Sequence, residues 1–322
     1  MAVLNPPSAL PGLARSITNY LLTSRAVYDE VRLTALFAPP GISDGGDRTR
    51  GVDNTLKAGR AIGLITQERS GPVTVSEVVK VWSKGSPFTR EEFRQVLRKL
   101  VLDMKRDGDP WTGDIEARTA GARDLSRALS WFLAQDALGP ALSWSGIDQY
   151  SAQWLQSQQL RHLPDQDRPI VNDTRWGAFS RWAVALGFAE PAAVHARPAI
   201  GPATTVLVGL VPLPLRAIRD VVCLMETGRR PVAAFLDELT AALPVLDGGM
   251  VRRGLGEMLE EDPDPGVRGN AVDTSISQSL LILEDEGHLK LTYGADAEAR
   301  VFTDPEGDKR VTSVDVMDGT GR

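Results

Sequence analysis

The chain has 322 residues, of which 42% are hydrophobic and 24% charged, and its formal net charge is −6. This composition can form buried cores and excludes an intrinsically disordered chain. At about 150 residues per domain, the length predicts two or three compact units. The single cysteine, Cys223, excludes an internal disulfide and a cysteine metal site within one chain, and it fits a reducing cytosol. It lies in an apolar helical stretch, so we expect it to be buried and inert.

Neither a membrane span nor a signal peptide is visible, so we expect a cytoplasmic protein. No run of about 18 apolar residues is present, and the N-terminus lacks the basic flank and apolar core of a leader. The charge is unevenly distributed. Residues 1–110 carry 16 Lys and Arg against 12 Asp and Glu, a net charge of +4, and the remainder carries 20 against 30, a net charge of −10. The front third can therefore approach phosphates, whereas the rest is repelled from DNA at long range.

The first segment, residues 1–84, predicts three helices followed by a β-hairpin. Apolar positions at helical spacing, a polar loop before the third helix and two β-prone runs carry this prediction. The order is that of a winged helix-turn-helix. The expected elements are helices at 13–21, 29–37 and 52–61, a loop at 43–51, and strands at 64–67 and 72–75.

The middle segment, residues 85–212, predicts a central helical region with a second winged-helix-like unit. Thr89 and Glu92 form the sequence signature of a capping box at the start of a helix. Further helices are expected at 122–138 and from Asp173, followed by a loose hairpin over 193–211. Tryptophans at helical spacing stack single-stranded bases in some proteins but favour a core here. They are Trp131, Trp144, Trp154, Trp176 and Trp182.

The last segment, residues 213–322, predicts a C-terminal helical or winged-helix domain. Helices are expected at 215–225, 232–243, 249–259 and 274–287. A second wing would pair 289–293 with 300–302. The last helix is expected to expose Ser275, Gln278 and Ser279, followed by acidic residues 284–286. Because an acidic face repels phosphate, this module favours a protein partner or a scaffold role.

The three segments together predict a mainly α protein with small β-hairpin wings, an α+β fold. It would consist of multiple winged helix-turn-helix modules joined by helices.

In a winged helix, the third helix enters the major groove and the wing touches backbone or minor groove. Arg and Lys suit guanine edges or phosphates, and Asn suits adenine. The three-residue spacing of Asn54, Lys57 and Arg60 predicts that they share one face. The alternative is a solvated helix face on a protein-binding winged helix. The candidate DNA-binding residues are Arg48, Arg50, Asn54, Lys57, Arg60 and Arg69.

No motif for catalysis, a cofactor or a metal is present, so we expect a non-enzymatic protein. The three histidines stand far apart, and no nucleophile elbow, phosphate loop or dinucleotide fingerprint occurs. Asp262 and Asp264 have the spacing of part of a calcium loop, but the intervening prolines favour a linker.

The opening residues 3–11, Val-Leu-Asn-Pro-Pro-Ser-Ala-Leu-Pro, together with the first helix and wing, resemble the DpdG family. The length and the late wing at 289–302 agree with this resemblance. It implies a role in bacterial gene clusters that insert 7-deazapurine bases into DNA and restrict DNA lacking them, beside helicase-like and nuclease-like partners. The resemblance carries over no catalytic residues.

The leading hypothesis is a DNA-binding subunit of a modification-restriction or phage defence system. In it, the first module contacts duplex DNA, and the acidic C-terminal part docks partners or a second copy of the chain. One alternative is an assembly adaptor whose winged helices bind only proteins. Another is a transcriptional regulator.

Overall fold

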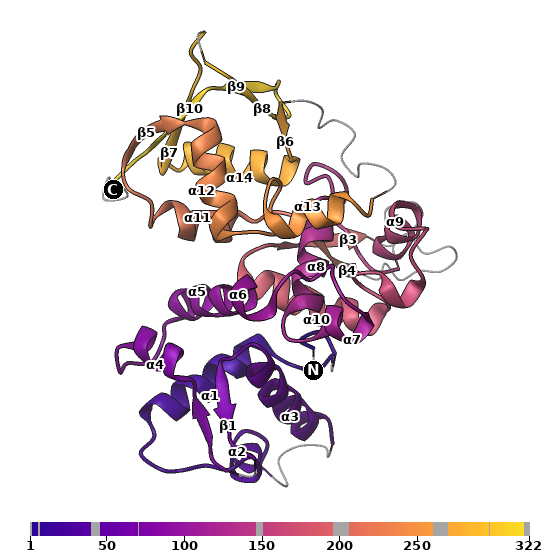
Figure 1. The fold of residues 1–322 in the computed structure, drawn as a ribbon, viewed down its shortest axis with the longest axis vertical. Helices are drawn as coiled ribbons and strands as arrows, with labels where there is room; N and C mark the ends of the chain where they lie inside the picture. Colours follow the sequence, from indigo (N-terminus) through magenta and orange to yellow (C-terminus); the bar gives the residue numbers. More distant parts are fainter. Residues whose placement is uncertain are drawn as a thin grey trace. The chain divides into compact units, whose positions relative to one another are not determined.

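The computed structural model describes residues 2–5, 7–39, 46–69, 71–145, 151–195, 206–259, 270–295 and 297–318 (Figure 1). The fold is mixed α+β, with many helices and small sheets. It divides into two compact units, residues 1–126 with 174–186, and residues 127–173 with 187–322. The division into three segments stays a prediction.

The first unit begins with three helices and a hairpin, in the predicted order. Its third helix begins at Gly46, six residues earlier than expected, so part of the predicted loop is helical. Further helices follow, and α8 crosses the boundary between the units. The elements are α1 (Pro11–Thr23), α2 (Glu30–Phe37), α3 (Gly46–Ala61), β1 (Ile65–Gln67), β2 (Val73–Val75), α4 (Glu77–Ser83), α5 (Arg90–Val101), α6 (Met104–Asp107), α7 (Ile115–Thr119), α8 (Arg123–Leu133) and α10 (Asp173–Leu186).

Local sequence signals explain where several of these helices begin. Pro11 occupies the first turn of α1, where a missing N–H costs nothing. The Asp29 carboxylate caps α2 by accepting the Arg32 amide at 2.8 Å. The predicted capping box of α5 is confirmed, because Thr89 and Glu92 satisfy each other's backbone amides. These caps fix the helix ends independently of tertiary packing.

The chain before α1 is held inside the first unit by a buried carboxylate. Val3 and Leu4 are almost completely buried, and their amides donate to the two oxygens of Asp124. The Leu125 amide also donates to Asp124. Burial raises the pKa of Asp124 to about 6, against the lowering effect of these amides and of Arg175. The opening segment is thus a fixed part of the core.

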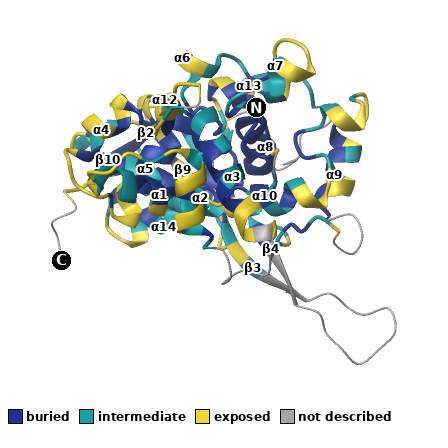
Figure 2. Cartoon of the chain, turned by 90° about the horizontal axis from the view of Figure 1, so that it is seen from below, coloured by how far each residue is buried: buried dark blue, intermediate teal, exposed yellow. Residues whose placement is uncertain are grey.

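Within its described residues, the second unit contains a helical part, a long hairpin and two three-stranded sheets. α8, which is buried on nearly every side from Asp124 onward, leads into it (Figure 2). Its elements are α9 (Ala152–Gln159), the 3-10 turn Asp165–Asp167, β3 (Glu190–His195), β4 (Val206–Val211), α11 (Leu215–Val222), β5 (Gly228–Pro231), α12 (Val232–Ala242), α13 (Met250–Gly256), β6 (Ala271–Val272), α14 (Thr274–Asp285), β7 (Leu289–Thr292), β8 (Arg300–Phe302), β9 (Lys309–Val311) and β10 (Ser313–Val316).

The second wing expected at the C-terminus is wrong in its pairing. β7 pairs with β10, which also pairs with β5, giving the antiparallel order β5-β10-β7. β8 instead pairs with β9, and in parallel with β6. The two predicted strands, β7 and β8, exist but belong to different sheets, because β10 and not β8 pairs with β7. The predicted hairpin in the middle segment is confirmed as β3 and β4, and its tip at 201–202 lies outside the described residues.

Backbone from between two helices contacts a later hairpin or sheet at three places in the described parts of the chain. In the first unit, the Val73 amide of β2 donates to the Tyr28 carbonyl, which lies between α1 and α2. In the second unit, Leu142, between α8 and α9, bridges β4 through Leu210. β5, between α11 and α12, pairs with β10. Each time, backbone from between two earlier helices hydrogen-bonds to the second strand of a later antiparallel pair, by one hydrogen bond at Tyr28, a bridge at Leu142 and a full strand at β5.

Two predictions about burial are corrected by the structure. Cys223 is exposed, because α11 ends at Val222 and the cysteine lies just beyond its buried face. Among the tryptophans, Trp131, Trp176 and Trp182 are buried, as expected of core residues. Trp154, however, is 41% exposed on α9.

Candidate nucleic-acid interface

The site predicted from sequence lies on α3 and the β1–β2 hairpin. The buried face of α3 includes Val52 and Leu56, which are almost completely buried and hold the helix in the core. The Thr55 hydroxyl accepts the Leu10 amide at 3.0 Å and donates to the Gly51 carbonyl. These interactions fix the rotation of α3 about its axis and so determine which of its side chains reach solvent.

Two of the predicted cations lie in the exposed first half of α3. Arg48 and Arg50 are both exposed. Two residues apart on a helix, they point in directions roughly 200° apart, so they widen the basic end of α3 rather than form one row. Positive charge at a helix N-terminus opposes the favourable end of the helix dipole, so these two arginines are not placed there to stabilise the helix.

Asn54 does not lie on the exposed face, and this part of the prediction is wrong. The side chain is only 6% exposed, and its amide nitrogen donates to the Ser8 hydroxyl. The partner is 46 residues earlier in the chain, so helical spacing alone could not reveal it. In this position Asn54 attaches the opening segment to α3 and is not available to an adenine edge.

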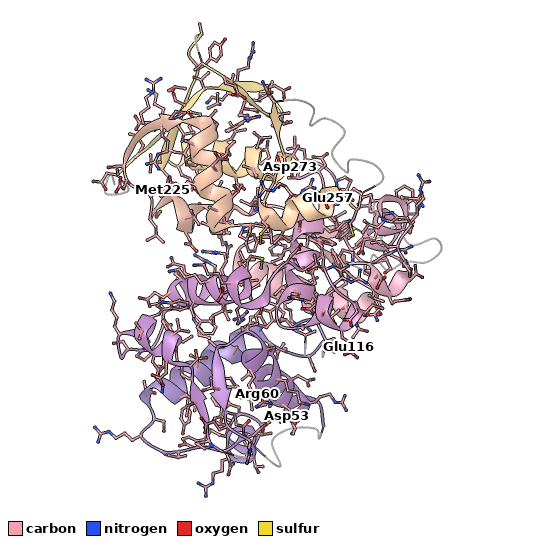
Figure 3. All side chains as sticks on the ribbon, viewed as in Figure 1. Asp53, Arg60, Glu116, Met225, Glu257 and Asp273 are labelled. Atoms are coloured by element: carbon pink, nitrogen blue, oxygen red, sulfur yellow. The ribbon has the colours of Figure 1, made fainter. Side chains whose placement is uncertain are left out.

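Arg60 is engaged within the first unit. Its guanidinium donates to Gln67 at 2.7 Å and forms a 3.2 Å ion pair with Glu30. One side chain thus links α3 to both β1 and α2. Asp53 lies on the same side of α3 and accepts a hydrogen bond from Thr34 of α2 (Figure 3). Both side chains support the packing of α2 on α3.

Lys57 is half-buried between the positions of Asp53 and Arg60 along α3. Among the residues the structure describes, no hydrogen bond or ion pair holds its ammonium group. An ammonium on a flexible four-carbon stem can extend toward a phosphate without breaking an internal interaction. Of the three residues predicted to share a face, Lys57 is thus the one that remains suited to a ligand.

Arg69 lies at the turn of the hairpin, as predicted. It is exposed and has a φ of 47°, a left-handed conformation that is uncommon for a residue with a side chain. The strands beside it are in register from Ile65 opposite Val75 to Gln67 opposite Val73. The hairpin therefore presents a cation at its outer end.

The sequence reasoning missed two further exposed cations, Arg25 and Arg32, on either side of the α2 N-terminus. The available signal was, for Arg32, its position beside Leu33, the buried residue of α2, and for Arg25, the polar break Thr23-Ser24-Arg25 between the first two helices. Two exposed apolar residues accompany them, Val27 at 69% and Val31 at 77% exposure. The surface around α2 is therefore both basic and apolar.

The last helix, α14, is not exposed in the way the sequence predicted. Ser275 and Ser279 are buried, and the Ser275 hydroxyl donates to the Leu133 carbonyl at 2.9 Å. The Thr274 hydroxyl accepts the Ala137 amide, and Gln278 donates to the Thr303 carbonyl. The first half of α14 is thus packed inside its own unit.

The acidic residues at the end of α14 are paired within the second unit. Glu284 forms an ion pair with Lys309 and accepts the Leu291 amide. Glu286 pairs with Arg219. Glu284 and Glu286 therefore have partners inside the second unit, and their presence on α14 does not require a partner protein.

In the described parts of the chain, no group of three His, Cys, Asp or Glu side chains could hold a metal ion. Within the same residues, no helix combines the length and apolar character needed to cross a bilayer.

The fold defines the class of the protein as mixed α+β, with helical segments followed by small hairpins. Exposed arginines lie on α3 and on the first hairpin, β1–β2. The chain belongs to the DpdG-like family, whose model matches residues 1–297. The resemblance noted from the sequence is thereby confirmed, and membership associates the chain with the 7-deazapurine modification system. No curated protein and no solved structure matches the chain.

Proposed function

We propose that the protein is a non-enzymatic, winged-helix DNA-binding subunit of a 7-deazapurine modification-restriction system. The observation that carries the proposal is the set of cations on α3 and the hairpin: Arg48, Arg50 and Arg69 are all exposed. In winged-helix proteins these two elements meet the groove and the backbone. Asn54 and Arg60 leave the proposed DNA-binding set because both are engaged inside the unit.

The strand arrangement supports the winged-helix interpretation of this region. Besides the hairpin itself, the Tyr28 carbonyl, from between the first two helices, accepts the Val73 amide of β2 at 2.8 Å. This hydrogen bond helps to hold the hairpin against the helices, so that a wing and a third helix can meet DNA together. The arrangements at Leu142 and at β5 extend the same interpretation to two later modules.

The mechanism is phosphate anchoring by the first unit, with the second unit serving assembly. Lys and Arg neutralise phosphates and release condensed counterions, which makes binding depend on salt. The front third has a net charge of +4, and the rest has −10. Because the first half of α14 is packed internally, the C-terminal module is better suited to docking helicase-like or nuclease-like partners than to reading a groove.

The test is fluorescence-anisotropy binding of the full chain to duplex and single-stranded DNA over a salt series. The triple variant Arg48→Gln, Arg50→Gln, Arg69→Gln is expected to reduce the slope of log affinity against log salt by about 2.7, because each neutralised phosphate contributes about 0.9 to that slope. A matched control is Lys84→Gln, Arg90→Gln, Lys105→Gln. It removes the same charge from exposed positions of the same unit, on or beside α4, α5 and α6.

The proposal requires the first triple variant to lose binding and the control to retain it. Equal effects of the two triples would mean that only net charge matters, which would refute an interface on α3 and the hairpin. Absence of duplex binding by the unchanged protein at low salt would refute DNA binding itself.

A protein-binding adaptor is the second candidate, and the exposed Val27 and Val31 favour it. Contiguous exposed apolar surface marks contact sites in soluble proteins, and these two strongly exposed valines lie four residues apart in the chain. Under this alternative, Val27→Ser with Val31→Ser abolishes co-purification of a partner from the source cell, and DNA binding is absent throughout.

A further inference from the structure

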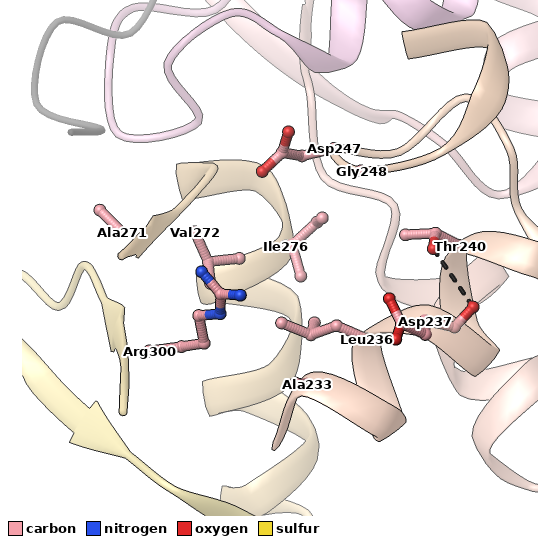
Figure 4. A pocket seen from close by; sticks show the side chains of 10 residues that line it. All are labelled: Ala233, Leu236, Asp237, Thr240, Asp247, Gly248, Ala271, Val272, Ile276 and Arg300. Carbon is pink, nitrogen blue, oxygen red and sulfur yellow. Dashed lines mark hydrogen bonds between the residues drawn. The ribbon is translucent and has the colours of Figure 1, made fainter. Parts of the chain in front are cut away.

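A pocket of 240 Å³ opens in the second unit between α12 and α14, with β6 and β8 along its other side (Figure 4). Pockets for drug-sized ligands typically measure about 300–1,000 Å³, so this one suits a smaller metabolite. Its walls combine an apolar surface with charged side chains of both signs. The residues that matter for its chemistry are Leu236, Asp237, Asp247, Val272, Ile276 and Arg300.

Regular elements hold these side chains in place. Leu236 and Asp237 lie one turn before Thr240 on α12, so the same helix contributes both apolar and acidic surface. Arg300 begins β8, where it is paired with Val311 of β9. Asp247 precedes Gly248, whose φ of +81° is a conformation that favours glycine and turns the chain at the pocket edge.

The apolar wall comes from α12, α14 and β6. Ile276 is 1% exposed and Val272 is 4% exposed, so their positions are fixed by the core. Leu236 lies opposite Val272 and Ile276, on α12. The side chain of Arg300 extends from β8 toward these apolar residues (Figure 4). A ligand with an apolar body would bury that body against these three residues.

The charged groups are incompletely neutralised within the protein. Arg300 has an ion pair with Glu298, but the distance is 3.5 Å and Glu298 is 67% exposed, so the pair is weak. Neither the Asp237 nor the Asp247 carboxylate has a hydrogen bond or an ion pair within the described part of the chain. The pocket therefore offers two acceptor-only carboxylates and one donor-only guanidinium.

We propose that this pocket binds a small zwitterion of the amino-acid class. The ligand's ammonium group would lie at Asp237 and Asp247, and its carboxylate would accept a charge-assisted hydrogen bond from Arg300. Its side chain would contact the apolar wall. A neutral nucleoside such as guanosine would leave these charges without a charged partner, whereas a zwitterion offers one to each sign. This inference is independent of DNA binding.

The experiment is equilibrium dialysis of the full chain against a mixture of the standard free amino acids with guanosine added. Chromatography then identifies what the protein retains. One apolar amino acid is expected to be enriched. Its N-acetyl and carboxamide derivatives should each bind at least about ten-fold more weakly, because each removes one charge and the hydrogen bonds that go with it.

Two variants test the site from opposite ends of the ligand. Arg300→Gln and Asp247→Asn are each expected to weaken retention about ten-fold or more. The control, Arg253→Gln, removes an exposed charge from α13 outside the pocket lining and should leave retention unchanged. Circular dichroism checks that each variant is folded. If Arg300→Gln in β8 unfolds, Asp247→Asn, in a loop, still tests the site.

Three results would overturn the proposal. They are retention of no amino acid, retention of guanosine instead, and equal retention by the folded Arg300→Gln or Asp247→Asn variant.

Discussion

The carboxylate of Asp124 should make the stability of the first unit depend on pH in an unusual direction. Burial raises its pKa from 3.8 to about 6, whereas acidic groups in ion pairs usually have lowered values. The folded state therefore binds this proton more tightly than the unfolded state does. The contribution to stability is fully present below about pH 4 and is lost as the pH rises through 6.

The magnitude follows from the size of the shift. A difference of about 2 pKa units at about 1.4 kcal/mol per unit gives about 3 kcal/mol of unfolding free energy, which disappears between pH 4 and pH 7. The variant Asp124→Asn removes this dependence. It also removes an acceptor, because Val3 and Leu4 donate to different oxygens of Asp124 and one of these becomes an NH2 donor in asparagine. We expect it to cost a further 1–3 kcal/mol, roughly, at every pH.

The assay is urea unfolding at a series of pH values, followed by hydrogen exchange of peptides from the first unit, so that the second unit does not contribute. The difference in unfolding free energy between the unchanged protein and Asp124→Asn should shrink by about 3 kcal/mol from pH 4 to pH 7. A difference that stays constant with pH would refute the assignment of a raised pKa. A difference that grows with pH would mean that the Asp124 pKa is lowered.

Two further pairs of variants separate structural from ligand-binding roles. Lys57→Gln should reduce the salt slope of DNA binding by about 0.9 without changing stability. Arg60→Gln should lower the free energy of unfolding by about 0.5–1.5 kcal/mol, because Glu30 and Gln67 lose their partner, while the salt slope stays the same; a reversed pattern in the anisotropy and urea measurements would contradict this division. Gly249→Ala should destabilise the second unit by about 1–3 kcal/mol, because its Cβ would lie 2.7 Å from the Pro244 carbonyl carbon. Gly256→Ala, with nothing within 4 Å, should be neutral or stabilising by up to about 1 kcal/mol in thermal unfolding, and equal effects of the two would count against this packing.

The elements of the fold could be predicted from local sequence more completely than their partners. Helical spacing located α1, α2 and α12 to within about two residues, because caps and apolar stripes are encoded nearby. The pairing of β7 could not be found in this way. Its partner β10 comes after a nearer β-prone run at 300–302, which sequence reasoning chose instead.

In the candidate interface, too, local features could be predicted and long-range contacts could not. Arg48, Arg50 and Arg69 are exposed as predicted, because a helix start and a hairpin turn are local features. Asn54 was misplaced because its partner is 46 residues away, and the engagement of Arg60 by Glu30 spans 30 residues. The pocket was missed altogether. The available signal was Asp237, an acidic residue in the middle of the apolar helix α12.

The position of β10 in the middle of its sheet has a consequence for synthesis on the ribosome. β5 is complete at Pro231, but the strand that joins it to β7 begins only at Ser313. At roughly 5–20 residues per second, β5 waits several seconds for its partner. During that interval β5, and towards its end β7 as well, offers unpaired backbone groups to any neighbouring chain. The last strand to emerge therefore closes the sheet, and premature termination before it would leave an aggregation-prone nascent chain.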